Sequence, residues 1–214
     1  MRKIFILSPA HTAGARAGLI RNPRAPFDLA QRLRSATGVP LGEAFSFLSG
    51  LYFRGKLAYA TKFARPPEGI PGVLVITSNR GLLSADVPIT LADLRTFSEV
   101  PIDPSDVRYF GPLQGHAELL VKAAGLRCDF VLLGSISTPK YVEVLLKFFG
   151  KRLLFPPSFV GRGDMSRGGL LLRCAREKRE LEYAPLAGAV RRGPRPPKLE
   201  PEKAQSSRFK SVEH

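Results

Sequence analysis

The sequence has no tryptophan, only two cysteines and three histidines, and no long apolar run. A membrane-spanning helix needs about 20 consecutive apolar residues, so a membrane protein is not expected. Cys128 and Cys174 form no Cys-x-x-Cys pair, which argues against a disulfide-stapled or zinc-binding class. We interpret both as ordinary buried thiols, and we predict neither a metal nor a cofactor.

Acidic residues are also scarce, with 18 Asp and Glu against 33 Lys and Arg, for a formal net charge of +15. The excess is not confined to the C-terminal end, because the segment from Ala187 onward carries seven Lys or Arg against three Glu. A basic folded body indicates an anionic partner, either nucleic acid or a phosphorylated ligand. The other interpretation is that the arginine excess reflects a GC-rich genome.

The chain begins MRKIFILSPA, whose apolar stretch is too short for the core of a signal peptide. We therefore interpret it as a first strand and expect a cytoplasmic protein. A length of 214 residues suits one substantial core. We predict an α/β domain over residues 1–185 and a disordered, basic, Pro-rich tail over residues 186–214. The oligomeric state stays open.

The segment from Cys128 to Arg173 predicts the architecture. Phe130–Leu133 is a continuous apolar run, typical of a strand that is buried on both faces of a parallel sheet. Thr138 and Pro139 predict a helix start, and Gly150 predicts its end. Further strands are expected at residues 3–7, 72–77 and 153–155, and an antiparallel hairpin at residues 170–174 and 180–183.

These elements predict a single Rossmann-like α/β domain with three layers, a mostly parallel sheet and a C-terminal antiparallel hairpin. In such sheets the ligand crevice lies at the carboxyl ends of the strands. Polar side chains that follow each strand are therefore the candidates for a binding site.

The first such loop follows residues 3–7 and is rich in small residues. His11, Thr12 and Arg16 lie in it, and we assign His11 a catalytic role and the other two a ligand-binding role. Small residues let backbone amides come close to a ligand. The alternative is a connector whose small residues only pack closely.

The second loop follows residues 72–77 and reads Ser-Asn-Arg-Gly. Asn79 can both donate and accept hydrogen bonds, and Arg80 can grip an anion with two parallel bonds. We predict that both bind the ligand. The alternative is a turn with no chemical role, in which Gly81 supplies the sharp bend.

The third group follows the strand at residues 130–133, where Ser135 and Thr138 are predicted ligand-binding residues. The loop PPSFVGRGDMSRGG comes after the next strand. In it, Arg162 and Arg167 suit a phosphate, and Asp164 suits a sugar hydroxyl, a base edge or a water molecule, which makes it our second catalytic candidate. Alternatively, the Arg and Asp side chains of this loop pair with each other.

Residues 41–64 have apolar and aromatic side chains at helical spacing. Arg54, Lys56 and Lys62 are interleaved with them, a mixture that can stack bases and hold phosphates. Core packing is the preferred interpretation of the aromatic residues, because helical periodicity already accounts for them.

Two stretches are similar to known families. LYFRGKLAYATKFA followed by VLVITSNRGLL, over residues 51–83, resembles the YaaA-like bacterial proteins. Pro156–Ser158 is similar in place to the proline-containing loop with which uracil-DNA-glycosylase-like α/β proteins meet DNA, although Phe155 stands where those proteins usually have a histidine. The two likenesses imply a nucleic-acid-related role, and neither covers the whole chain or assigns a catalytic residue.

Our first hypothesis is thus a protein that binds nucleic acid or a nucleotide-like ligand at the strand-end rim and acts on a nucleobase or its glycosidic bond. The second is an enzyme that acts on a small anionic metabolite carrying a phosphate or carboxylate. The third is a noncatalytic RNA-binding protein. The sequence does not decide whether the protein is an enzyme.

Overall fold

The fold is built on one central sheet, seen in a computed structural model that describes residues 1–197. Within these residues the sheet has six strands in the order β4-β3-β1-β6-β7-β8. The four inner strands are parallel, and the two edge strands pair antiparallel with their neighbours. The bounds are β1 Arg2–Leu7, β3 Val73–Ile76, β4 Leu82–Ser84, β6 Cys128–Leu133, β7 Leu153–Phe155 and β8 Ala184–Pro185. The predicted Rossmann-like α/β class is confirmed.

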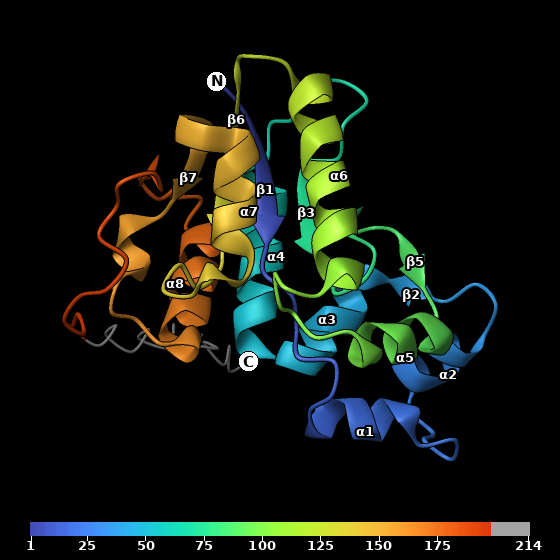
Figure 1. Ribbon diagram of the computed structural model, residues 1–214. Coiled ribbons are helices and arrows are strands. Elements are labelled where there is room, and N and C mark those ends of the chain that lie inside the picture. The colour runs from blue at the N-terminus through green and yellow to red at the C-terminus, as the bar shows by residue number, and fades with distance from the viewer. Residues whose placement is uncertain (198–214) are drawn as a thin grey trace, which may run out of the picture.

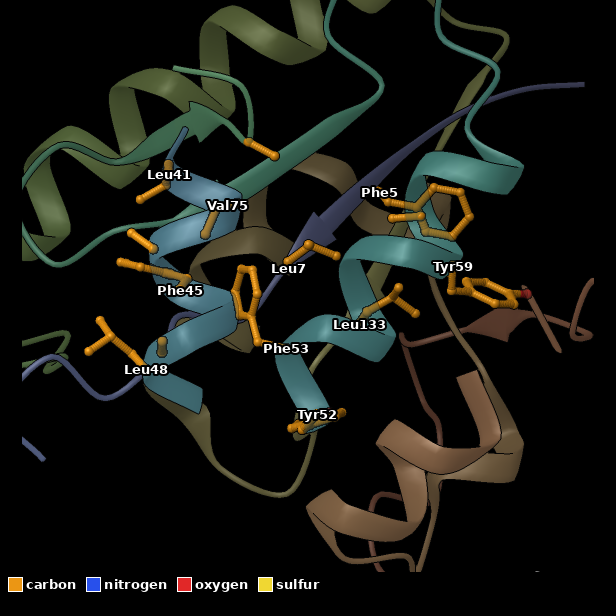
Figure 2. Close-up of a cluster of buried hydrophobic side chains, with 14 of the residues drawn as sticks. Phe5, Leu7, Leu41, Phe45, Leu48, Tyr52, Phe53, Tyr59, Val75 and Leu133 are labelled. Atoms are coloured by element: carbon orange, nitrogen blue, oxygen red, sulfur yellow. The ribbon is translucent and has the colours of Figure 1, made fainter. Parts of the chain in front are cut away.

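Helices cover both faces of this sheet (Figure 1). Along β1, Ile4 and Ile6 join one buried cluster, whereas Phe5 and Leu7 join the other, because successive side chains of a strand point to opposite faces. The first cluster is closed by α6 (Val107–Ala124) and α7 (Pro139–Phe149). The second is closed by α3 (Leu41–Ser49), α4 (Leu51–Phe63) and α8 (Asp164–Arg176), and Figure 2 shows part of it.

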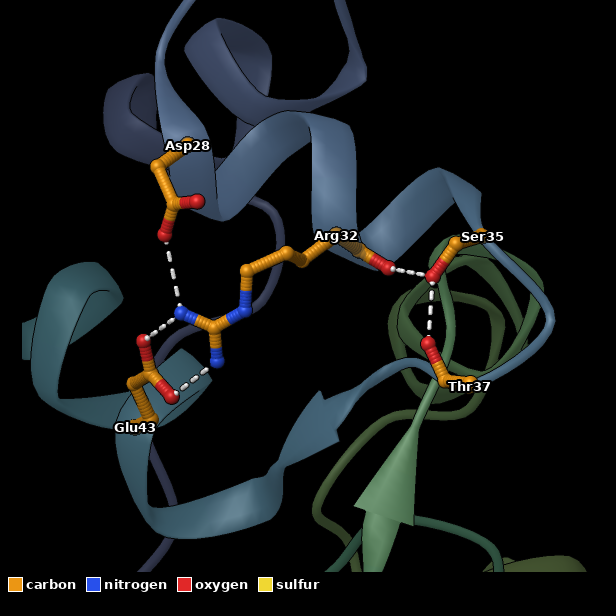
Figure 3. Close-up of polar contacts among 5 residues, drawn as sticks. All are labelled: Asp28, Arg32, Ser35, Thr37 and Glu43. Carbon is orange, nitrogen blue, oxygen red and sulfur yellow. Dashed lines mark hydrogen bonds and ion pairs between the residues drawn. The ribbon is translucent and has the colours of Figure 1, made fainter.

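Smaller elements surround α3. They are α1 (Ala15–Arg21), α2 (Asp28–Arg34), α5 (Leu91–Glu99) and a second, two-stranded sheet of β2 (Val39–Pro40) and β5 (Pro88–Ile89). Arg32 on α2 donates two hydrogen bonds to Glu43 on α3, at 2.8 and 2.7 Å, and a third to Asp28 (Figure 3). This forked contact ties α2 to α3. Two short 3₁₀ turns, Gly150–Arg152 and Pro157–Phe159, flank β7.

The helical stretch expected at residues 41–64 is two helices. Gly50 separates α3 from α4 with a φ of +62°, a conformation that residues with a Cβ rarely adopt. The break lets Phe45 of α3 and Phe53 of α4 meet edge to face at 5.5 Å between ring centres.

The expected strand at residues 170–174 is wrong, because these residues lie in α8. Leu170, Leu171 and Cys174 are buried at helical spacing against α4. A Cβ on Gly168 would stand 2.8 Å from the backbone oxygen of Leu51, so Gly168 of SRGG serves a close helix contact with α4. The antiparallel partner near the C-terminus is β8, which pairs with β7.

Residues 186–197, expected to begin a disordered tail, contact the body. Leu186 is fully buried and its amide donates to the Leu153 carbonyl. Arg191 forms an ion pair with Glu143 at 2.5 Å. The rest of the expected tail, residues 198–214, lies outside the described residues. In the described part of the chain, no helix is long and apolar enough to cross a membrane.

Candidate functional site

A pocket of about 490 Å³ opens at the carboxyl ends of β1, β3 and β6. Residues from these strand ends and from α3, α4, α5, α7 and α8 line it. Among them are Ser8, Ala10, His11, Thr12, Ala13, Phe45, Tyr52, Lys56, Ser78, Phe97, Ser135, Lys140, Tyr141 and Asp164. Pockets of this size accommodate small-molecule ligands.

The loop after β1, residues 8–13, forms one wall and is called the β1 loop below. Ala10–Ala13 all line the pocket. Within residues 1–197, no backbone carbonyl accepts a hydrogen bond from their four amides. Backbone N–H groups without an internal acceptor, in residues that line a concave space, are available to bind an anion.

Lys56 on α4 lies at the bottom of the site, with only 1% of its surface exposed. Its Nζ lies 2.6 Å from the Ser8 carbonyl oxygen and 2.8 Å from the Ser8 Oγ. Nζ also lies over the rings of Tyr52 and Phe53, at 4.6 and 4.7 Å from their centres. A buried lysine needs such partners, because burial removes the water that stabilises its charged ammonium group.

Burial lowers the pKa of the Lys56 amine to about 7, with a further lowering by Arg167, whereas the carboxylate of Asp164 raises it. An amine with this pKa is present in both charged and neutral forms near neutrality. Lys56 can therefore take up and release a proton in the range where general acid–base catalysis is most efficient.

Gly134, at the end of β6, brings Tyr141 and Ser8 together. A Cβ at residue 134 would stand 2.8 Å from the Ser8 Cβ and 2.9 Å from the Tyr141 hydroxyl. The Tyr141 hydroxyl donates to the Ser135 carbonyl at 2.8 Å. Burial raises the pKa of Tyr141 to about 12, although the neighbouring Ser8 hydroxyl lowers it, so Tyr141 is a neutral hydrogen-bonding group here.

Two helices begin at the pocket. Lys140 and Tyr141 lie in the first turn of α7, and Asp164 is the first residue of α8. The N-cap residues Thr138 and Gly163 make no side-chain capping hydrogen bond. Helix N-termini carry partial positive charge, so the start of α7 adds to the attraction for an anion, whereas the Asp164 carboxylate offsets this effect at the start of α8.

Four of the residues predicted from the sequence meet in this pocket: His11, Thr12, Ser135 and Asp164. They come from three separate segments, so the expected convergence of strand-end loops is present for them. Asp164 also forms an ion pair with Arg167 at 3.3 Å, the arrangement that the alternative interpretation of this loop anticipated.

None of the four predicted arginines is among the residues that line this pocket, and each has partners within the protein. Arg16 donates to the Phe47 carbonyl, Arg80 pairs with Asp93, and Arg162 donates to the Ser158 carbonyl. Arg167 is buried and donates to the Phe159 carbonyl.

Two further predicted ligand-binding residues lie near the pocket but do not line it. Thr138 is the N-cap of α7. The Asn79 Oδ1 is buried, and no hydrogen-bond partner for it exists among the described residues. Its neighbour Ser78 reaches the pocket instead.

Sequence reasoning missed the buried position of Lys56. A signal was present, because Lys56 stands three residues after Phe53 and three before Tyr59, within the apolar stripe of α4. A lysine on the apolar face of a helix either interrupts that face or is a buried amine held by polar partners. Ser8 and Tyr141 carried no such signal.

Comparison of the chain with protein-family models, with curated protein sequences and with solved structures gives no match in any of the three. The resemblances noted from the sequence therefore stay predictions. No group of three His, Cys, Asp or Glu side chains that could hold a metal ion occurs within residues 1–197.

Proposed function

We propose that the protein binds a nucleotide-like anion in the strand-end pocket. The observation that carries this proposal is the run of four pocket-lining residues, Ala10–Ala13, whose backbone amides donate to no backbone carbonyl within residues 1–197. Lys140 and the start of α7 add positive potential at the same place, whereas the Asp164 carboxylate offsets that of the α8 start. A phosphate group satisfies such donors through its oxygens.

The rest of the pocket suits a nucleobase. Phe45, Tyr52 and Phe97 line it and are each at most 6% exposed, so they form an aromatic wall that is fixed by packing and has little free ring surface. A base would contact this wall as an apolar surface rather than stack between open rings. The volume of about 490 Å³ admits one nucleotide unit, so a nucleic-acid strand would enter by turning a single base out of its stack.

Action on the base or its glycosidic bond is the reaction class that we favour for this ligand. Positive charge develops on the sugar when a glycosidic bond breaks. Asp164, whose side chain lines the pocket and is about two-thirds exposed, supplies a carboxylate to stabilise that charge.

A small anionic metabolite is the second candidate, and the specific observation that favours it is the same amide run. Carboxylates and phosphates both accept hydrogen bonds from backbone N–H groups, and neither needs the aromatic wall. The noncatalytic RNA-binding alternative rests on the basic composition alone.

The test is equilibrium binding of a fluorescent mononucleotide by the full chain over a salt series, with inorganic phosphate, unlabelled mononucleotides and single-stranded oligonucleotides as competitors. We expect saturable binding with a shallow salt dependence, because one ligand neutralises few charges, whereas many phosphate contacts give a steep dependence. Lys140→Met should weaken binding, and Lys62→Met, an exposed lysine on α4, serves as the matched charge control.

The outcome separates the candidates. Competition by mononucleotides but not by inorganic phosphate supports a nucleotide site, and competition by phosphate alone supports the metabolite candidate. Oligonucleotide binding that is steep in salt and indifferent to mononucleotides would place recognition on the outer surface and contradict the proposal.

A further inference from the structure

We infer that Ser8 and Lys56 form a nucleophile and general-base pair for acyl transfer on an ester or amide that enters the strand-end pocket. This inference goes beyond ligand binding and does not depend on the ligand being a nucleotide. It rests on the placement of the two side chains and of the amides next to them.

The first observation is the contact itself. The Lys56 Nζ lies 2.8 Å from the Ser8 Oγ, a distance at which a neutral amine can accept the hydroxyl proton. The second contact, 2.6 Å to the Ser8 carbonyl oxygen, holds Nζ in place beside this one hydroxyl. A serine becomes a nucleophile when an adjacent base takes its proton, and lysine serves as that base in one known variant of the serine triad.

The second observation is that the amine is kept in a dry setting. Lys56 is fully enclosed by Tyr52 and Phe53 of its own helix, by Ser8, and by α8, from which Asp164 and Arg167 act on its charge in opposite directions. Ser8 is 7% exposed and lines the pocket. The hydroxyl therefore stands between the base and the space that a substrate would fill.

The third observation is the amide run that follows Ser8. The tetrahedral intermediate of acyl transfer carries a negative oxygen, which backbone N–H groups stabilise when they are fixed in advance. Ala10–Ala13 line the same pocket, and their N–H groups have no backbone acceptor in the described part of the chain. The nucleophile, the base and the oxyanion donors thus come from one loop and one helix.

The reaction balances with water as the second reactant. The Ser8 Oγ forms a bond to the carbonyl carbon as its proton passes to the Lys56 Nζ. The intermediate collapses, the bond from carbon to the leaving group breaks, and the Lys56 ammonium returns a proton to that group. Water then attacks the acyl-serine with Lys56 again as base, which releases the acid and restores Ser8.

The test uses a fluorophosphonate probe, which phosphonylates activated serines with loss of fluoride, on the full chain. We expect one label per chain, located at Ser8 by peptide mass mapping, and no label on Ser8→Ala. Lys56→Met should slow labelling at least 100-fold. Two controls should react at the wild-type rate: Ser105→Ala, which removes an exposed hydroxyl outside the pocket, and Lys62→Met, which removes an exposed lysine from the same helix.

A measurement on the unmodified protein covers the case in which a variant does not fold. Wild-type protein mixed with p-nitrophenyl acetate and quenched in acid should carry one acetyl group at Ser8. Labelling at another residue, a wild-type rate in folded Lys56→Met, or no acetyl group in the quenched protein would overturn the inference. Mononucleotide binding is measured separately, so the failure of either proposal leaves the other standing.

Discussion

Two loops that look alike in the sequence differ in what their backbone does. The β1 loop leaves the amides of Ala10–Ala13 without a backbone acceptor in the described chain, and these residues line the pocket. The loop after β3, residues 77–81, is called the β3 loop and is closed on itself. Both the Thr77 amide and the Thr77 hydroxyl donate to the Gly81 carbonyl, and the Arg80 amide donates to the Thr77 hydroxyl.

The difference shows that polar residues at a strand end do not by themselves make a site. In the β3 loop the Thr77 and Arg80 amides and the Thr77 hydroxyl are used internally, and the Arg80 side chain pairs with Asp93 at 3.1 Å. In the β1 loop the donors are available, and a buried base stands behind the first hydroxyl. The β1 loop is therefore distinguished by four consecutive pocket-lining residues whose amides have no backbone acceptor within residues 1–197, whereas the β3 loop contributes only Ser78 to the pocket.

The largest expected effect comes from breaking the β3 loop. Gly81 has a φ of +61°, and a Cβ there would stand 2.4 Å from the Pro112 carbonyl oxygen. We expect Gly81→Ala to lower the free energy of unfolding by about 3 kcal/mol, from strain and the clash together. Urea unfolding measures this loss.

Mononucleotide affinity, measured well below the melting temperature, should stay at the wild-type value in Gly81→Ala. Gly115→Ala is the matched control, because a Cβ there meets nothing within 4 Å and the residue is inside α6. In Gly115→Ala the free energy of unfolding should rise by about 0.5–1 kcal/mol, because alanine loses less backbone entropy in a helix than glycine. A loss of affinity in folded Gly81→Ala would assign Asn79–Gly81 to the site.

The next effect concerns the buried amine behind the β1 loop. The pKa of Lys56 is lowered from 10.5 to about 7 by burial, so between these values the unfolded chain binds one more proton than the folded chain. Stability should therefore rise with pH across this range, by at most about 1.4 kcal/mol per pH unit from this group. Lys56→Met lacks this dependence.

The measurement is urea unfolding of both proteins from pH 6.5 to 9. The groups that act on Lys56 from the surrounding elements are Tyr52, Asp164 and Arg167, none of which is altered in the variant. The wild-type protein should gain stability relative to Lys56→Met as the pH rises. Parallel pH profiles for the two proteins would show that Lys56 is charged throughout.

A smaller effect is expected from crowding the β1 loop. Gly134→Ala places a Cβ 2.8 Å from the Ser8 Cβ, so Ser8 and its neighbours must shift by several tenths of an ångström. We expect about a tenfold loss of mononucleotide affinity with a stability loss of about 1–2 kcal/mol. Unchanged affinity would show that the position of Ser8 does not affect ligand binding.

The smallest effect is expected for Arg80→Ala. The guanidinium is 43% exposed and its partner Asp93 30%, and ion pairs of this kind contribute about 0–1 kcal/mol. Both the melting temperature and the ligand affinity should stay close to the wild-type values. A marked loss of affinity would restore Arg80 as a ligand-binding residue.

The sequence predicted the sheet well, because unbroken apolar runs such as Phe130–Leu133 have few other interpretations in a chain without long apolar helices. It predicted α8 wrongly, since Leu170–Arg173 reads equally as a strand. The segment packs as a helix against α4, with Gly168 against the backbone of Leu51, and this partner lies more than a hundred residues earlier in the chain.

The site was predicted by position rather than by chemistry. His11 and Asp164 reach the pocket because the carboxyl ends of parallel strands share one edge of the sheet. The arginines were expected to bind the ligand, but their partners, such as Asp93 for Arg80, are fixed by tertiary packing that residue spacing does not show. The contact of Lys56 with Ser8 joins segments 48 residues apart, so it too is fixed by tertiary packing that residue spacing does not show.

The most direct test is to follow the backbone amide resonances of both loops by NMR while a mononucleotide is added. Our account predicts that the signals of Ala10–Ala13 shift with ligand concentration and that those of Asn79–Gly81 stay in place. Shifts confined to the β3 loop, or to exposed arginines away from the pocket, would contradict it.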